Sequence, residues 1–185
     1  SDWFRSNAHA GSLVGYLAGF SHTTAVMRTP QALFRIAAEA VEDLAADNVV
    51  YAEIRYAPAL HTTAPLPLPA VVEAVSDGLY EGMRRAARVG KHITAVSILS
   101  AMRNTDDWMP TAQAAVQFRD SVVAFDIAGP EYGFPASRGF DTFMWLREHN
   151  MHVTIHAGEA FGPAAIADAV HRCGAERLGH GVRLA

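Results

Sequence analysis

Five short apolar segments, rich in β-branched and aromatic residues, alternate along this chain with amphipathic segments of helical periodicity. Apolar runs of this kind are typical of strands buried on both faces, and their alternation with helices predicts a parallel sheet covered by helices. We therefore expect one α/β domain. The expected strands are residues 49–58, 93–99, 122–128, 151–156 and 177–180.

The first long helix is expected to begin at Thr29-Pro30, because threonine can cap a helix and proline is tolerated in its first turn. It should run for about sixteen residues, since apolar residues recur there at intervals of three and four. Its expected buried face consists of Leu33, Ile36, Ala37, Ala40, Val41 and Leu44. Further helices are expected at residues 71–88, 110–119, 140–149 and 163–173.

Length and composition exclude several classes of protein. A chain of 185 residues can bury a sizeable core in one domain. Its single cysteine, Cys173, excludes a disulfide framework and a multi-cysteine metal cluster, and it fits the reducing cytoplasm. No apolar run reaches the roughly 18 residues that a membrane helix needs, and no signal peptide is visible. A net charge of −4 does not favour binding to a polyanion, so we expect neither a nucleic-acid nor a membrane partner.

Two architectures fit this pattern, an open doubly wound sheet and part of a (β/α)8 barrel. The first lacks its usual support, because no G-x-G-x-x-G follows the first strand and no G-x-x-x-x-G-K-[ST] occurs. Both architectures bind ligands at the carboxyl ends of their strands. Three consecutive strand segments carry or precede polar residues there, namely Asp126, His156 with Glu159, and His180. We expect these side chains to share one face.

The segment HAGEAFG directly follows an expected strand. A neutral His156 there can ligate a metal, Gly158 allows a sharp turn, and Glu159 can reach the same place. A histidine ligand beside a carboxylic acid is what hydrolysis by a metal-activated water requires. The alternative is a hydrogen-bonded core histidine followed by an acid that the helix dipole favours.

Two further segments place polar residues at or near strand ends. In RLGHGVR, His180 lies between glycines, so it can face a pocket, or it can simply be a turn residue. In AFDIAGPE, Asp126 interrupts an apolar strand, and a carboxylate there is costly unless it is paired. Its partner can be structural, or Asp126 can orient a metal-ligating histidine.

With VVYAEIRYAP, these segments resemble the adenosine deaminase family of the metal-dependent amidohydrolase superfamily, in the order expected for strands two, four, five and six of its barrel. The resemblance extends from about Leu13 to Arg183. It implies a (β/α)8 barrel with one catalytic Zn²⁺ at the carboxyl ends of the strands. It also implies hydrolytic deamination of adenosine and deoxyadenosine to inosine and deoxyinosine, with release of ammonia, in purine salvage.

The resemblance assigns a role to each site residue. His156 would be a zinc ligand, and Glu159 would donate a proton to the purine N1. His180 would orient the zinc-bound water that attacks C6 and help to deprotonate it. Gly129 would contact the purine through its backbone, and Asp126 would support the site from behind. Zinc lowers the pKa of its water towards about 7, which agrees with the chemistry inferred from the residues.

The family's zinc has more ligands than this chain offers. Two come from an H-x-H motif at the end of the first strand and one from an aspartate after the last, and neither segment is found here. A catalytic zinc typically needs about three protein ligands, so the others are expected outside this chain. We therefore expect residues 1–185 to form a single incomplete barrel domain with about strands 2 to 6 of 8.

Several functions stay open at this point. The substrate can be another adenine-containing compound, such as adenine or a modified nucleoside. The chain can also be an inactive fragment that keeps part of a nucleoside site, a binding protein without activity, or a zinc-independent hydrolase. The expected partner is a small purine nucleoside, and a homo-oligomer is left open. By resemblance, Leu17 and Phe20 would belong to an apolar lid over the pocket.

Overall fold

The computed structural model describes residues 11–184, in which five strands form one parallel sheet in the order β1-β2-β3-β4-β5. All five expected strands are confirmed, and the bounds of the third and fifth are those expected. The strands are β1 (Tyr51–Tyr56), β2 (Thr94–Met102), β3 (Val122–Ala128), β4 (His152–Ala157) and β5 (Arg177–His180).

Strand β2 continues three residues beyond its expected end at Leu99. The apolar run stops there because Ser100 is polar, but Ser100 is the register partner of Asp126 on β3. The Ser100 hydroxyl donates a hydrogen bond of 2.6 Å to the Asp126 carboxylate. This side-chain pair keeps the two strands together where hydrophobicity alone predicts an end.

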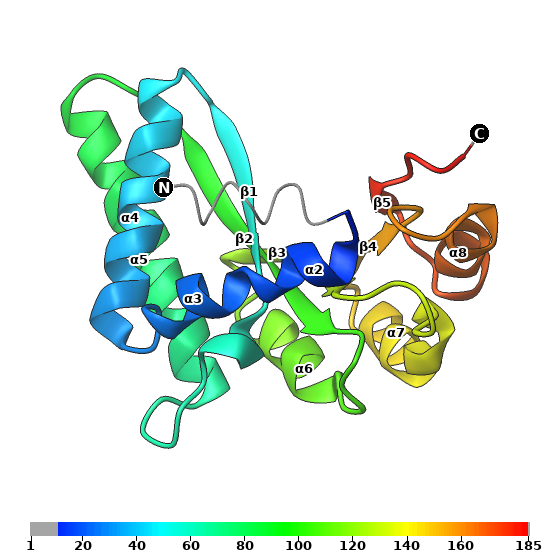
Figure 1. Ribbon diagram of the computed structural model, residues 1–185. Helices are drawn as coiled ribbons and strands as arrows, with labels where there is room; N and C mark the ends of the chain where they lie inside the picture. The colour runs from blue at the N-terminus through cyan, green and yellow to red at the C-terminus, as the bar shows by residue number, and fades with distance from the viewer. Residues whose placement is uncertain (1–10, 185) are drawn as a thin grey trace.

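The helices from Pro30 onward lie on the outside of the sheet, and the two short helices before them cross in front of it in the view of Figure 1. None within residues 11–184 has the length and apolar character needed to span a bilayer. The α-helices are α2 (Leu13–Ala18), α3 (Phe20–Ala25), α4 (Pro30–Ala46), α5 (Leu68–Arg88), α6 (Met109–Gln117), α7 (Phe140–Glu148) and α8 (Pro163–Ala167). Shorter turns are the 3₁₀ segments η1 (Pro58–His61) and η2 (Ala136–Gly139) and the π-helical η3 (Asp168–Arg172).

Two details of the expected helices need correction. Ile36 is 39% exposed, and the buried face of α4 turns slightly so that Ala38 is fully buried. The expected single helix over 163–173 becomes the π-helical η3 from Asp168 onward. The change from α-helix to π-helix occurs at a residue with a tertiary contact. The Asp168 carboxylate accepts a hydrogen bond from the backbone N–H of Ser137 at 2.9 Å. The expected cap is confirmed, since the Thr29 hydroxyl accepts the N–H of Ala32.

The core lies between the outer face of the sheet and the helices. One cluster joins β1 and β2 to α4 and α5, and its buried members include Leu33, Val41, Val71 and Leu79. A second cluster joins β3 and β4 to α6, α7 and α8, centred on residues such as Phe125, Phe143, Leu146 and Ile155. The apolar strand residues of these two clusters therefore point outward, towards the helices.

Several polar and charged side chains lie on the inner face of the sheet, and the sheet curls around them. Glu53 on β1 and Arg177 on β5 belong to the two edge strands, yet their side chains form an ion pair of 2.7 Å. The hydrogen bond from Arg177 holds the pKa of Glu53 below its usual range. A curled parallel sheet with helices outside is the arrangement of a (β/α)8 barrel and not of an open doubly wound sheet.

Candidate active site

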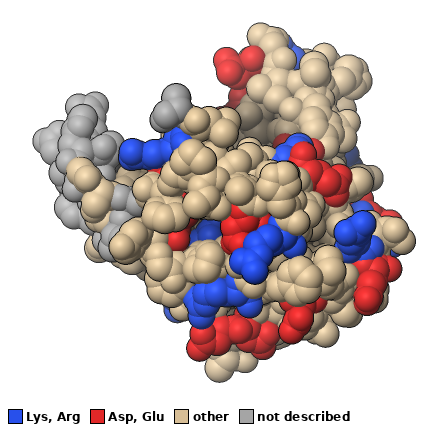
Figure 2. Space-filling model, turned by 90° about the vertical axis from the view of Figure 1, so that its right-hand side faces the viewer, with Lys and Arg blue, Asp and Glu red and all other residues tan. Residues whose placement is uncertain are grey.

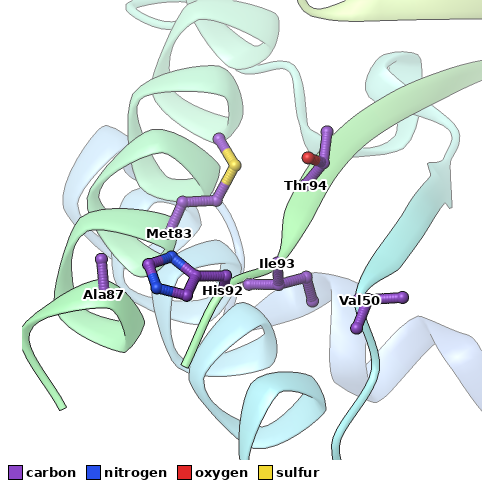
Figure 3. Close-up of a pocket in the computed structure, with 6 residues that line it drawn as sticks. All are labelled: Val50, Met83, Ala87, His92, Ile93 and Thr94. Carbon is purple, nitrogen blue, oxygen red and sulfur yellow. The ribbon is translucent and has the colours of Figure 1, made fainter. Parts of the chain in front are cut away.

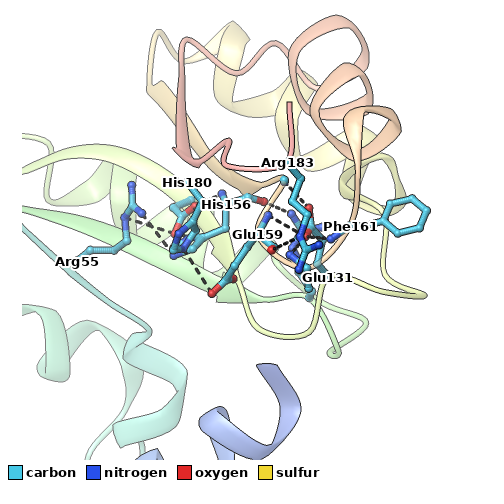
Figure 4. A network of polar contacts seen from close by, with 11 residues as sticks. Arg55, Glu131, His156, Glu159, Phe161, His180 and Arg183 are labelled. Carbon is cyan, nitrogen blue, oxygen red and sulfur yellow. Dashed lines mark hydrogen bonds and ion pairs between the residues drawn. The ribbon is translucent and has the colours of Figure 1, made fainter. Parts of the chain in front are cut away.

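The expected site residues gather at the carboxyl ends of β3, β4 and β5 (Figure 4). His156 is the penultimate residue of β4 and pairs with Gly179 of β5, and the register pairs Ala157 with His180. The loop with Glu159 begins directly after β4. Strand order thus brings together side chains that are more than twenty residues apart in the sequence.

Asp126 and His156 form the base of the site. Asp126 is fully buried, and its carboxylate lies 2.9 Å from Nδ1 of His156 and accepts the backbone N–H of His156 at 3.1 Å. Ser100 and Arg55 complete its surroundings, the Arg55 Nε at 3.6 Å. The sequence predicts that a buried Asp126 needs a partner, whether its role is structural or the orientation of a histidine. Asp126 is indeed paired, and most of its polar contacts are with His156.

This contact determines which nitrogen of His156 faces the interior. With Nδ1 against the carboxylate, Nε2 is the ring nitrogen on the far side, and it lies 3.4 Å from a guanidinium nitrogen of Arg55. Arg55 also donates a hydrogen bond to Thr154 at 3.2 Å. It has room because position 179 is glycine, where a Cβ would lie 2.8 Å from that guanidinium.

His156 fits a zinc site as one ligand, since a carboxylate on Nδ1 orients Nε2 towards a metal. It does not fit as a complete site. Within residues 11–184 there is no group of three or more His, Cys, Asp and Glu side chains that could hold a metal ion.

Glu159 and His180 meet on the solvent side of His156. Nε2 of His180 lies 3.6 Å from the Glu159 carboxylate, and the rings of His156 and His180 are 5.3 Å apart between centroids. Their side chains are only partly covered, 39% exposed for His180 and 28% for Glu159. A ligand entering from solvent can therefore touch both.

The backbone at this place is strained. His180 has a φ of +80°, in the left-handed region that costs a side-chain-bearing residue on the order of 1 kcal/mol. Gly158 also has a positive φ, which glycine adopts without strain, and a Cβ there would lie 2.6 Å from Ile166. Strain of this kind concentrates at functional sites, where the surrounding structure holds it in place.

The family model described as "Adenosine deaminase" matches residues 1–185. The chain belongs to the adenosine deaminase family. It is 54% identical over 183 residues to the adenosine deaminase of Mycolicibacterium vanbaalenii, covering 98% of this chain and 51% of that protein. The chain spans about half the length of the curated relatives it matches.

Solved structures of deaminases and amidohydrolases have the same fold. The N6-methyl-AMP deaminase of Arabidopsis thaliana matches with a TM-score of 0.79 at 26% identity, over 98% of this chain and 56% of that one. An amidohydrolase of Burkholderia ambifaria with bound Zn matches with a TM-score of 0.66 at 28% identity, over 83% and 42%. These likenesses confirm the barrel architecture expected from the sequence.

For a member of this family, the main residue that sequence reasoning missed is Glu131. It lies two residues after Gly129, inside the quoted AFDIAGPE segment, and is 5% exposed. Its carboxylate accepts backbone N–H groups from four consecutive residues, 158–161, at 2.6 to 3.1 Å. The available signal was an acidic residue in the loop directly after the strand of Asp126.

Arg103 was missed as well. It is 1% exposed and donates hydrogen bonds to the carbonyls of His156 and Phe134. Burial lowers the pKa of Arg103, and the carboxylates of Glu131 and Asp126 oppose that shift. The buried cation therefore interacts electrostatically with both buried carboxylates of the site.

Two other expectations stay predictions. Gly129 follows β3 with a φ of +99°, a conformation that suits close approach of its backbone to a ligand. For the lid, α3 contacts η1 at the carboxyl end of β1, and Phe20 is 44% exposed with its ring against Tyr16. No contact shown by the structure joins Leu17 or Phe20 to Glu159 or His180.

One cavity of about 490 Å³ lies elsewhere (Figure 3). It is lined by Val50, Met83, Ala87, His92, Ile93 and Thr94, at the amino ends of β1 and β2. Barrel enzymes place their chemistry at the opposite end of the strands, so we do not assign this cavity to the active site.

Proposed function

We propose that the full-length protein deaminates adenosine and deoxyadenosine hydrolytically, adding water at C6 of the purine and releasing ammonia. The observation that carries this proposal is the meeting of Glu159 and His180, at 3.6 Å, beside a histidine that Asp126 orients. The similarity to adenosine deaminases that are 53% and 54% identical to this chain supports the choice of substrate.

Glu159 and His180 divide the proton transfers between them. The Glu159 carboxyl group donates a proton to N1 of the purine, which makes C6 electrophilic, and His180 takes a proton from the attacking water. Because Glu159 and His180 lie close together, they can act on the two neighbouring purine atoms N1 and C6. Gly129 is proposed to contact the purine through its backbone.

His156 is the residue of this chain that would hold zinc, through Nε2. When bound, zinc supplies a Lewis acid that makes hydroxide available at neutral pH. The Asp126 carboxylate keeps the His156 ring in the required orientation, and Arg55 compensates the buried negative charge. The remaining ligands are proposed to lie outside residues 11–184.

The proposed partner is a small nucleoside, with no nucleic acid or membrane involved. On the face shown in Figure 2, basic and acidic side chains are interspersed, which supports the absence of a polyanion surface there. Purine salvage in the cytoplasm is the setting that this substrate suggests. A homo-oligomer is compatible with the proposal and is not needed for the chemistry of Glu159 and His180.

A second substrate class rests on the structural likeness to the N6-methyl-AMP deaminase. The test is a substrate panel with the full-length protein: adenosine, deoxyadenosine, adenine and N6-methyl-AMP. We expect the highest kcat/KM for the two nucleosides, with activity lost on chelation and restored by Zn²⁺. A higher kcat/KM for adenine or N6-methyl-AMP would overturn the assignment of adenosine and deoxyadenosine as substrates. Activity that survives chelation would contradict the role of zinc.

A further inference from the structure

Glu131 makes an unusual set of contacts. Its Oε1 accepts the N–H of Gly158 at 2.6 Å, and its Oε2 accepts those of Glu159, Ala160 and Phe161 at 3.1, 2.7 and 2.7 Å. One buried carboxylate from the β3 loop thus binds four consecutive amides of the loop after β4.

The energetics favour a rigid arrangement. A buried carboxylate is costly unless hydrogen bonds replace its hydration, and bonds from N–H groups to an ionised acceptor are among the strong ones. Here four N–H donors provide that replacement, and the buried Arg103 supplies a nearby positive charge. Conversely, the four amides would be without these partners if the carboxylate were removed.

The opposite side of the same loop is held by the segment after β5. The backbone N–H of Arg183 binds the carbonyl of Gly158 at 3.1 Å, and its side chain binds the carbonyl of Glu159 at 3.1 Å. In Figure 4, Glu131 and Arg183 meet the loop backbone, while the Glu159 side chain extends towards the two histidines. The structure gives that side chain one polar contact, with His180.

We propose that Glu131 is a positioning residue, whose carboxylate fixes the loop 158–161 so that Glu159 reaches N1 of the purine. The inference rests on the proposed function, because it assigns Glu159 the proton transfer. Glu131 itself touches neither substrate nor metal in this account. It acts through the backbone of Glu159, and the loss of Glu131 should slow the chemical step more than it weakens substrate binding.

The experiment compares Glu131→Gln with Glu148→Gln in the full-length protein, since Glu148 is an exposed glutamate at the end of α7. Glutamine has nearly the shape of glutamate, but its NH₂ group cannot accept hydrogen bonds from the backbone N–H groups that it would face. We expect kcat to fall about 10²-fold in Glu131→Gln with KM little changed, because a misplacement of about 1 Å costs that much. Glu148→Gln should behave as the wild type.

A double variant separates positioning from general damage. If Glu131 acts through Glu159, adding Glu131→Gln to Glu159→Gln should cause little further loss of kcat. Additive losses, or an unchanged kcat in the single variant, would overturn the proposal. If Glu131→Gln does not fold, Glu131→Asp serves instead; it keeps the charge but is too short to reach all four amides, and the same non-additivity is required.

Amide hydrogen exchange provides a readout that needs no activity. The amides of residues 158–161 should exchange faster in Glu131→Gln than in the wild type, with exchange in the preceding strand β4 unchanged. Unchanged protection would overturn the proposal even if activity fell. If the wild type deaminates no purine, the proposed function fails, and the exchange result alone decides whether Glu131 holds the loop.

Discussion

At the scale of single residues, the site depends on space as much as on chemistry. Gly158 begins the loop of Glu159, with a φ of +71° and no room for a Cβ beside Ile166 and Gly181. Any larger residue at this position would strain the loop that brings its amides to Glu131. Gly90, at the end of α5, has a similar φ of +76° but open space around it.

These two glycines make a matched pair of variants. Gly90→Ala should destabilise the protein by about 1 kcal/mol, the cost of a left-handed alanine. Gly158→Ala should add a further 1–3 kcal/mol or so from overpacking, and it should also lower the activity. Urea unfolding of both variants measures the difference. Equal losses of stability would show that the Ile166 contact yields without cost.

The individual site residues were predictable to different degrees. Asp126 lies within an apolar strand, whereas His156, Glu159 and His180 lie at or just after strand ends, and strand order places all four together. Glu131 could not be assigned, because its partners are backbone amides 27 to 30 residues away, which carry no signal of residue type. The contacts of Arg55 with β3 and β4 likewise follow from the curl of the sheet, which the sequence does not specify.

At the scale of elements, the closest packing joins α4 and α5. A Cβ at Gly82 would lie 2.6 Å from the Ala38 carbonyl and 2.7 Å from the Cβ of Val41. The two helix backbones approach each other at this point.

Gly82→Ala should therefore destabilise the protein by about 1–3 kcal/mol, although alanine is the better helix former. Asp77→Ala, on the exposed face of the same helix, controls for helix propensity and should stay within about 0.5 kcal/mol of the wild type. Both are measured by chemical unfolding. A stabilised Gly82→Ala would contradict the close approach of the helices.

The 3₁₀ turn η1 contains a buried titratable residue, His61. His61 is 5% exposed, and its Nδ1 lies 3.0 Å from the carbonyl of Met27. Burial lowers the pKa of His61, so the unfolded chain binds a proton more readily than the folded one. The contribution of this residue to stability is then complete above the unfolded pKa of about 6.5 and is lost as the pH falls below it.

The prediction is a free energy of unfolding that decreases as the pH falls below about 6.5 and decreases less steeply in His61→Gln. The exposed His171 provides the control, since His171→Gln should keep the wild-type pH dependence. Urea unfolding at several pH values tests this. Parallel pH profiles for the wild type and His61→Gln would contradict it.

At the scale of the whole molecule, the strand pattern predicts the class of fold but does not by itself distinguish a barrel from an open sheet. Alternating apolar strands and helices fit both an open sheet and a barrel, because both bury the strands on two faces. The absence of phosphate-binding motifs favoured the barrel. The ion pair between Glu53 and Arg177 shows the curl directly, and it depends on two inward-facing side chains from opposite edges of the sheet.

This arrangement predicts how the 185 residues behave when they are expressed alone. They should bind far less than one zinc per chain and deaminate no adenosine, because His156 is the one proposed ligand among the described residues. Elemental analysis of the purified chain, beside the full-length protein, measures the zinc. Stoichiometric zinc with turnover in the 185-residue chain would show that these residues suffice.

The central claim is that Glu159 moves a proton in the deamination of a purine nucleoside. The most direct measurement is the rate of conversion of adenosine to inosine by the full-length protein and by its Glu159→Gln variant. We predict that the wild type releases ammonia and inosine in equal amounts. In Glu159→Gln, kcat should fall about 10²- to 10⁴-fold with unchanged zinc content. A variant that keeps the wild-type rate would contradict the claim.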